Sequence, residues 1–288
     1  MSDGAGADSA SGLIPDLWSA ADRACEDELR QAIATGELLP ALLAIEGADA
    51  DARAAVEAWL SARAERVKEL LAEGESSSVK RVVDALALAL GREGGLAGDG
   101  GNYYAVDNSK LSRVLARRAG QPILMAAVWM LVGRRAGFAV VGVGLPGHFV
   151  VGVEGKIVDA YQGGQFLSLE QCRQIAARAL PGRPFDQSWL APASVQVMVE
   201  RVLRNLANAH RQAEDDVGAY RALRLLAAIM PADGPVQIEL ARLTEEHGAW
   251  PDALAMLRGI AARFAGRREG QIAELKVMEL ESRTRVLN

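Results

Sequence analysis

Apolar residues recur every three or four positions through the first third of the chain. The spacing is clearest in two runs: Val56, Leu60, Val67 and Leu70, then Val79, Val83, Leu86 and Leu90. A stripe of this period is typical of helices that bury one face, so the pattern predicts that 16–90 is helical. Hydroxyl side chains at 76–78 offer N-caps for the last of these helices.

The pattern changes in the next segment. The run 91–101 is rich in glycine and predicts a flexible connector. A phosphate-binding loop would need a preceding strand and a Gly-Lys-Ser/Thr motif, and this run has neither. A short helix is predicted over 110–118. The run that begins at Pro122 and ends near Gly137 is apolar almost all round, so it predicts a helix buried in the middle of a domain.

Short β-branched segments follow this buried helix. The segment 139–143 predicts one strand, and 148–153 and 156–161 predict two more, joined by a two-residue turn at 154–155. The sequence therefore predicts an α+β core in which an antiparallel sheet packs on the central helix.

The predicted hairpin brings two polar side chains together. A two-residue turn places Asp159 opposite Val150, so that Asp159 and His148 lie on one face as diagonal neighbours, roughly 7 to 8 Å apart by backbone. A three-residue turn would move Asp159 to the other face, so the inference depends on the length of the turn. A histidine beside a carboxylate is the arrangement found in cysteine-triad enzymes.

From residue 195 onward the pattern is helical again, and it repeats. Residues that match at a separation of 34 are Leu206 and Leu240, Ala207 and Ala241, Ala219 and Ala253, Leu223 and Leu257, Arg224 and Arg258, Ala227 and Ala261, and Met230 and Phe264. The pattern follows the tetratricopeptide template, with Leu203 and His210 in place of its aromatic residues. Two helix pairs and a closing helix near 271–283 are predicted, and so short an array should dock on the preceding domain.

Composition narrows the class of protein. Half of the 288 residues are apolar, and the net charge is −5 with both signs interspersed, which favours a globular protein and disfavours nucleic-acid binding. The longest apolar run, 123–132, is too short to span a membrane. The segment 1–12 lacks the basic and apolar parts of a secretory signal, so a cytoplasmic protein is expected.

Cysteine usage predicts neither a disulfide framework nor a metal centre. The two cysteines, Cys25 and Cys172, lie far apart in predicted helices and show no zinc-binding spacing. No metal and no cofactor are therefore predicted.

Several motifs occur in an order that resembles the bacterial SirB family of transglutaminase-like proteins with C-terminal tetratricopeptide repeats. The matching pieces are Gly101-Asn102-Tyr103-Tyr104, Asn108-Ser109, Leu111, Val114-Leu115, Arg117-Arg118, Gly120, Pro122, Leu145-Pro146-Gly147-His148-Phe149, Val158-Asp159, Gly163-Gly164, Arg201 and Asn205-Leu206. The resemblance covers about 42–264. It implies a helical region plus a transglutaminase-like, papain-like core over 16–192 and a repeat region over 193–288, and the composition of the opening segment predicts a disordered tail over 1–15.

The resemblance also implies a triad that lacks its nucleophile. The superfamily uses a Cys at the start of the central helix, a His on the next strand and an Asp on the one after. His148 and Asp159 match the last two roles, but the nucleophile position falls at Pro122, within one residue of Gln121 or Ile123. Loss of the nucleophile from a triad costs several orders of magnitude in rate. A structural role for the pair is therefore favoured, with Tyr103, Tyr104, Asn108 and Ser109 packed nearby.

Two functions remain open from the sequence. The first is a non-catalytic interaction protein whose degenerate transglutaminase-like domain and repeats bind a protein or peptide partner, with an acidic partner favoured by the basic side chains of the repeats. Five side chains are placed by spacing on the concave side of the repeats: Arg201, Arg204, Asn208, Arg211 and Arg242. The alternative is a hydrolase or peptidase-like enzyme in which His148 and Asp159 activate water. In a variant of this alternative, Cys172 replaces the nucleophile if its helix folds back over the hairpin.

Overall fold

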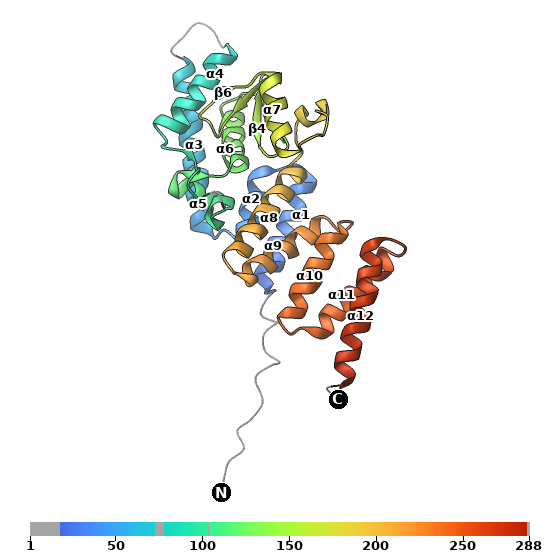
Figure 1. Ribbon diagram of the computed structural model, residues 1–288. Helices are drawn as coiled ribbons and strands as arrows, with labels where there is room; N and C mark the ends of the chain where they lie inside the picture. The colour runs from blue at the N-terminus through green and yellow to red at the C-terminus, as the bar shows by residue number, and fades with distance from the viewer. Residues whose placement is uncertain (1–17, 73–77, 103, 287–288) are drawn as a thin grey trace.

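The computed structural model describes residues 18–72, 78–102 and 104–286. The predicted tail over 1–15, the possible caps at Ser76 and Ser77, and Tyr103 lie outside these residues. Figure 1 shows an elongated molecule, with the main sheet and helix α6 towards one end and helix α12 at the other.

The N-terminal region is helical, as its apolar period predicts. It contains α1 (Ala20–Thr35), α2 (Leu38–Glu46) and α3 (Ala50–Ala72). Ser19 and Asp22 form a capping box at the start of α1, which satisfies backbone N–H groups that the helix itself cannot pair. Gly36, with φ 75°, ends α1 in the left-handed conformation that glycine tolerates best and lets α2 fold back on α1.

The glycine-rich run, predicted as a flexible connector, contains the end of a π-helical turn and a short strand. Helix α4 (Val79–Leu86) continues into a π-helical turn (Ala87–Arg92), and the following strand β1 (Ala97–Gly98) pairs in parallel with β2 (Ala119–Gly120). The ring of Tyr161 lies so close to Gly98 that a Cβ there would stand 2.4 Å from a ring carbon. At this position glycine therefore permits close packing.

The central helix and its sheet form the α+β core. The sheet has the order β3-β4-β5-β6 and is antiparallel throughout. Its strands are β3 (Val140–Val143), β4 (Val150–Val153), β5 (Lys156–Asp159) and β6 (Gln165–Phe166). Helix α6 (Pro122–Arg135) is buried along nearly its whole length and packs on β3 and β4, which confirms the buried helix predicted from its apolar run.

The register of the hairpin is the one that a two-residue turn predicts. Val151 pairs with Val158, and Val153 pairs with Lys156. Glu154 and Gly155 form the turn with φ values of 45° and 79°, the positive pair that a type I′ turn requires. Strand β4 begins at Val150, two residues later than predicted, so His148 precedes the strand. The edge strand β6 was not predicted, because two exposed residues carry no periodic signal.

Smaller elements connect these parts. A 3-10 turn (Val106–Ser109) leads into α5 (Leu111–Arg117), which ends two residues before β2 begins. Helix α7 (Leu169–Ala179) follows β6 and is capped by Ser168, and a second 3-10 turn (Gln187–Leu190) precedes the C-terminal helices.

Five helices complete the chain, and successive ones pack on each other. They are α8 (Val195–Gln212), α9 (Asp216–Ile229), α10 (Gly234–Glu246), α11 (Trp250–Arg263) and α12 (Arg268–Val286). Helix α8 also packs on α2, on α6 and on the first 3-10 turn, and α9 packs on α1. The main hydrophobic core therefore continues across residue 193 and reaches Leu243, while α10, α11 and α12 share a second, smaller cluster.

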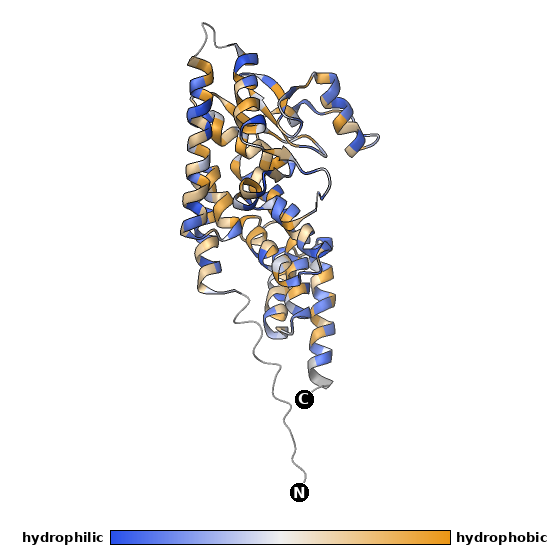
Figure 2. Cartoon of the chain, turned by 90° about the vertical axis from the view of Figure 1, so that its left-hand side faces the viewer, coloured by the Kyte–Doolittle hydropathy of each residue, from blue (hydrophilic) through white to orange (hydrophobic). Residues whose placement is uncertain are grey.

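Helix α12 has apolar residues on its solvent-exposed side as well as on the side that packs against α11. Figure 2 shows bands of orange and blue along α12, the helix next to the C-terminal label. Leu275 and Met278 are exposed on it. Across the described residues, no helix combines the length and the apolar character needed to cross a membrane.

Candidate functional site

His148 and Asp159 meet as the hairpin register requires. His148 follows a turn in which Gly147 has φ 73°, and Asp159 is the last residue of β5. The Nε2 atom of His148 lies 2.8 Å from Oδ2 of Asp159. The other carboxylate oxygen accepts backbone N–H groups of Tyr161 at 3.0 Å and Gln162 at 3.2 Å. The carboxylate is thus held at both oxygens, and it fixes the orientation of the imidazole through Nε2.

An open pocket of about 670 Å³ borders this pair. The ring of Tyr161 stands edge-on to the imidazole, with 6.0 Å between centroids. The remaining wall comes from α7 and from the loop after β5, and its polar side chains are Gln162, Gln165, Gln171, Gln174 and Arg178. The pair therefore faces a cleft rich in amide donors and acceptors.

The start of α6 carries no nucleophile. Pro122 occupies the first turn of the helix and is buried together with Ile123. Gln121 is 1% exposed, and both ends of its side-chain amide are engaged. Its Nε2 donates to Oγ of Ser109 at 3.1 Å, and its Oε1 accepts from Nδ2 of Asn205 at 2.7 Å. Hydrogen bonds to Ser109 and to Asn205 of α8 thus fix the side-chain amide of Gln121, the residue before Pro122.

Cys172, the alternative nucleophile, is a buried thiol on α7. Helix α7 does fold over the hairpin, as that alternative requires, but the thiol points into an apolar cluster with Val143, Leu145 and Val150. Burial raises the pKa of Cys172, which keeps the thiol protonated at neutral pH. Cys25 lies on α1 and lines a different pocket. The structure therefore brings neither thiol to His148.

The predicted polar cluster beside the pair divides in two. Asn108 and Ser109 are buried, and Ser109 bonds to Gln121, whereas Tyr104 is exposed. Asn108 and the backbone N–H of Asn102 donate to Asp99, which holds the pKa of that carboxyl below its usual range. Hydrogen bonds from Arg117 to Asn108 and Asp99 extend this network.

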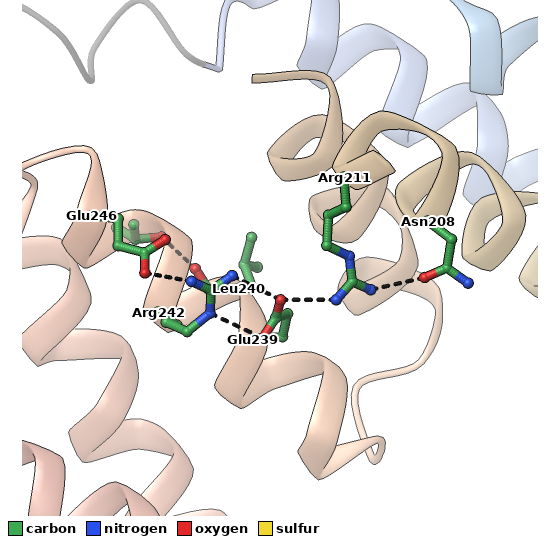
Figure 3. A network of polar contacts seen from close by, with 7 residues as sticks. Asn208, Arg211, Glu239, Leu240, Arg242 and Glu246 are labelled. Atoms are coloured by element: carbon green, nitrogen blue, oxygen red, sulfur yellow. Dashed lines mark hydrogen bonds and ion pairs between the residues drawn. The ribbon is translucent and has the colours of Figure 1, made fainter. Parts of the chain in front are cut away.

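Three of the five residues predicted to contact a partner line one groove. Arg204, Asn208 and Arg211 border a hollow of about 290 Å³ between α8, α9 and α10. Arg242 reaches the same place through Glu239, which accepts from Arg211 at 3.1 Å and from Arg242 at 3.0 Å (Figure 3). Asn208 accepts from Arg211 at 3.0 Å.

Arg201, the fifth of these residues, is not part of the groove lining. Its Nη1 donates to the carbonyl oxygen of Leu145 at 3.1 Å, and its guanidinium lies 5.4 Å from the ring centroid of Phe149. Spacing along α8 cannot show that this face of the helix lies against the loop before β4. Arg201 therefore joins α8 to the core instead of lining the groove.

The groove arginines already have acidic neighbours. Arg204 pairs with Glu200 at 2.9 Å and also with Asp233, and Arg242 pairs with Glu246 as well as with Glu239. The hydrogen bond from Arg242 lowers the pKa of Glu239 and keeps it ionised. The groove thus contains a network of ion pairs, and its surface is not uniformly positive.

No group of three or more His, Cys, Asp or Glu side chains that could hold a metal ion exists within 18–72, 78–102 and 104–286.

Comparison with known proteins gives one family match. The profile of the transglutaminase-like superfamily matches residues 54–204, just over half of the chain. This match takes in β1 to β6, α6, the His148–Asp159 pair and the first part of α8.

The curated relatives are matched over part of their length. A UPF0162 protein of Xylella fastidiosa (strain Temecula1) is 32% identical over 190 residues, 63% of this chain and 61% of the relative. F-box only protein 21 of Homo sapiens is 26% identical over 201 residues, 62% of this chain and 31% of the relative. The chain thus spans less than two thirds of the length of these relatives. No solved structure gives a significant match.

Proposed function

The chain belongs to the transglutaminase-like superfamily, and from that premise we propose that it is a non-catalytic member that binds a protein partner. One observation carries the proposal: the central helix begins with the buried Pro122 where the superfamily has its nucleophilic Cys. Acyl transfer by the superfamily mechanism needs a thiolate within hydrogen-bond reach of the histidine. In this chain the two thiols lie elsewhere.

In this proposal the His148–Asp159 pair holds the fold and shapes a binding cleft. The 2.8 Å bond ties the segment before β4 to the end of β5, next to the open pocket. A hydrogen bond to a buried carboxylate contributes on the order of 1–3 kcal/mol. Replacement of His148 by Ala should therefore lower stability without removing an activity.

The C-terminal helices supply the second half of the proposal. We assign α8 to α11 as two tetratricopeptide-type pairs of the kind found in the SirB family, which the repeated residues support. Helices α9 and α11 begin at Asp216 and Trp250, at the same 34-residue separation as the sequence repeat. Arrays of this type hold extended peptides on their inner helices. The groove lined by Arg204, Asn208 and Arg211 would be the peptide site.

An acidic peptide could enter this groove by exchange of ion pairs. Each arginine would give up an internal carboxylate and take one from the peptide. Exposed ion pairs are worth roughly 0–1 kcal/mol each, so the exchange costs little and lets partner charge decide specificity. The names of the relatives state no reaction, which is compatible with a binding role.

Two paired arginines make a sharp test of the groove. We expect Arg242→Glu to reduce recovery of the partner when the full chain is used for affinity purification from native extract. Arg258→Glu is the matched control, because Arg258 also pairs with a carboxylate, that of Glu281 at 2.6 Å, but lies on α11 away from the groove residues. Equal recovery with both variants and with the unchanged chain would contradict the groove.

A second candidate function is a hydrolase in which His148 activates water. The observation in its favour is that Nε2 of His148 bonds to Asp159, which leaves Nδ1 as the second ring nitrogen beside an open pocket. This mechanism would also need a group that stabilises an oxyanion. Turnover of activated esters or peptides by the unchanged chain, lost in His148→Asn, would favour the hydrolase over the binding protein.

A further inference from the structure

Two arginines share one aromatic ring on the surface between α3 and α5. The guanidinium carbons of Arg63 and Arg118 lie 5.9 Å and 5.0 Å from the ring centroid of Trp59. Arg118 ends α5 with φ 61°, a left-handed conformation that non-glycine residues seldom adopt. The backbone at this position thus adopts an unusual conformation where its side chain meets Trp59.

Neither guanidinium forms a salt bridge within the described part of the chain, although Nη1 of Arg63 donates to the carbonyl oxygen of Ala89 at 3.5 Å. Nε of Arg63 and Nη1 of Arg118 are buried, and no hydrogen-bond partner is present for either among the residues described. The nearby carboxylate of Glu93 is bound at both oxygens by Arg66, at 2.8 Å and 2.9 Å. Burial, and then the charge of Arg63, lower the pKa of Arg118. Two like charges therefore stand together partly desolvated, an arrangement that an anion would stabilise.

A pocket of about 300 Å³ lies beside this pair. Trp59, Arg118, Arg113 and Ser112 form its polar and aromatic wall. The rest of the lining is apolar and mostly small: Ala52, Ala55, Val56, Leu115 and Ala116. A pocket of this size, with cations on one wall and aliphatic groups on the others, fits a small molecule with a charged end and an apolar body.

We propose that the pocket between α3 and α5 binds a small organic carboxylate with an apolar body, held by Arg118 and packed on Trp59, while Arg63 lies outside the lining and adds only its nearby positive charge. A planar guanidinium pairs with a carboxylate through two parallel hydrogen bonds, which gives strength and orientation. The indole face supplies apolar contact next to the charge. This site lies in the helical region and is independent of the partner groove and of the His148 cleft.

Calorimetric titration of the full chain tests the chemistry of the ligand. The probes are hydrocinnamate, its neutral analogue hydrocinnamyl alcohol, and acetate, which has the charge without the apolar body. Hydrocinnamate should bind at least about tenfold more tightly than either of the other two, since both the ion pair and the apolar contact are then made. Absence of hydrocinnamate binding, or equal affinity for the acid and the alcohol, would overturn the proposal.

Variants then test the two arginines. Arg118→Asn keeps a residue that tolerates the left-handed backbone, and Arg63→Gln keeps a polar side chain on α3. Arg118→Asn should weaken hydrocinnamate binding by about tenfold, the loss typical of one charged partner, and Arg63→Gln should weaken it less, because Arg63 does not line the pocket. Arg268→Gln, at the exposed start of α12, removes the same charge and should bind as the unchanged chain does. A melting curve confirms that each variant is folded. Unaltered affinity in the folded Arg63 and Arg118 variants would refute the site.

Discussion

Asn205 on α8 should contribute more to stability than its place on a peripheral helix suggests. Its Nδ2 donates at 2.7 Å to Oε1 of Gln121, which is 1% exposed at the start of α6. Asn205→Ala removes a donor from a buried amide oxygen, and the loss of such a bond costs about 1–2 kcal/mol. For a chain of this size each kcal/mol lowers the melting temperature by about 2–4 °C. The expected result is a lower melting temperature with an unchanged helical spectrum.

Asn208 is a close control for this substitution. It lies on the same helix three residues later, but its Oδ1 bonds to the exposed Arg211 and not to a buried group. Asn208→Ala should change stability by no more than about 0.5 kcal/mol. Urea denaturation, followed by circular dichroism, gives the free energy of unfolding for both variants under one condition. Equal values for the two variants, or an Asn205→Ala chain as stable as the unchanged one, would refute the role assigned to the bond between α8 and α6.

Three other predictions follow from burial. Leu223 is 3% exposed on α9, so Leu223→Ala should lower the free energy of unfolding by about 2–5 kcal/mol, whereas Val217→Ala at a 40% exposed position should have a small effect; equal effects in urea denaturation would contradict this. Burial lowers the pKa of His210, so the folded chain binds fewer protons at this residue than the unfolded chain does. Its contribution to the free energy of unfolding is therefore complete above the unfolded pKa of about 6.5 and is lost as the pH falls below that value. His210→Gln should therefore flatten the fall in urea midpoint between about pH 7.5 and pH 5.5, and an unchanged slope would count against this reasoning. A thiol reagent should label Cys25 in the native chain but Cys172 only in denaturant, as mass spectrometry of the labelled chain would reveal; rapid native labelling of Cys172 would contradict its burial.

The sequence predicted the parts of the site that local rules determine. The two-residue turn at Glu154 and Gly155 fixes the register, and the register places Asp159 beside His148. The apolar run after Pro122 could only be a buried helix. In each case neighbouring residues in the sequence carry the information.

The remaining parts depend on contacts between distant segments. Strands β1 and β2 pair two residues each, and the paired residues lie about twenty positions apart in the sequence. Strands this short have no periodic pattern of apolar residues from which the pairing could be predicted. Arg201 has the spacing of a groove residue, but the loop before β4 covers its face of α8. The sequence singled out Arg201 and Asn205 because they occur in one short motif. That motif does not indicate which part of the core each side chain contacts.

The packing of α8 on α2 has a consequence for synthesis of the chain. About 150 residues separate these helices, and at roughly 5–20 residues per second the ribosome needs on the order of 10–30 s to make them. During that interval the apolar helix α2 lacks its packing against α8. A nascent chain stopped after α7 should thus bind an apolar dye that the finished chain excludes. The nascent chain is therefore most exposed to aggregation before its C-terminal helices emerge, and chaperones that hold nascent chains would act in that period.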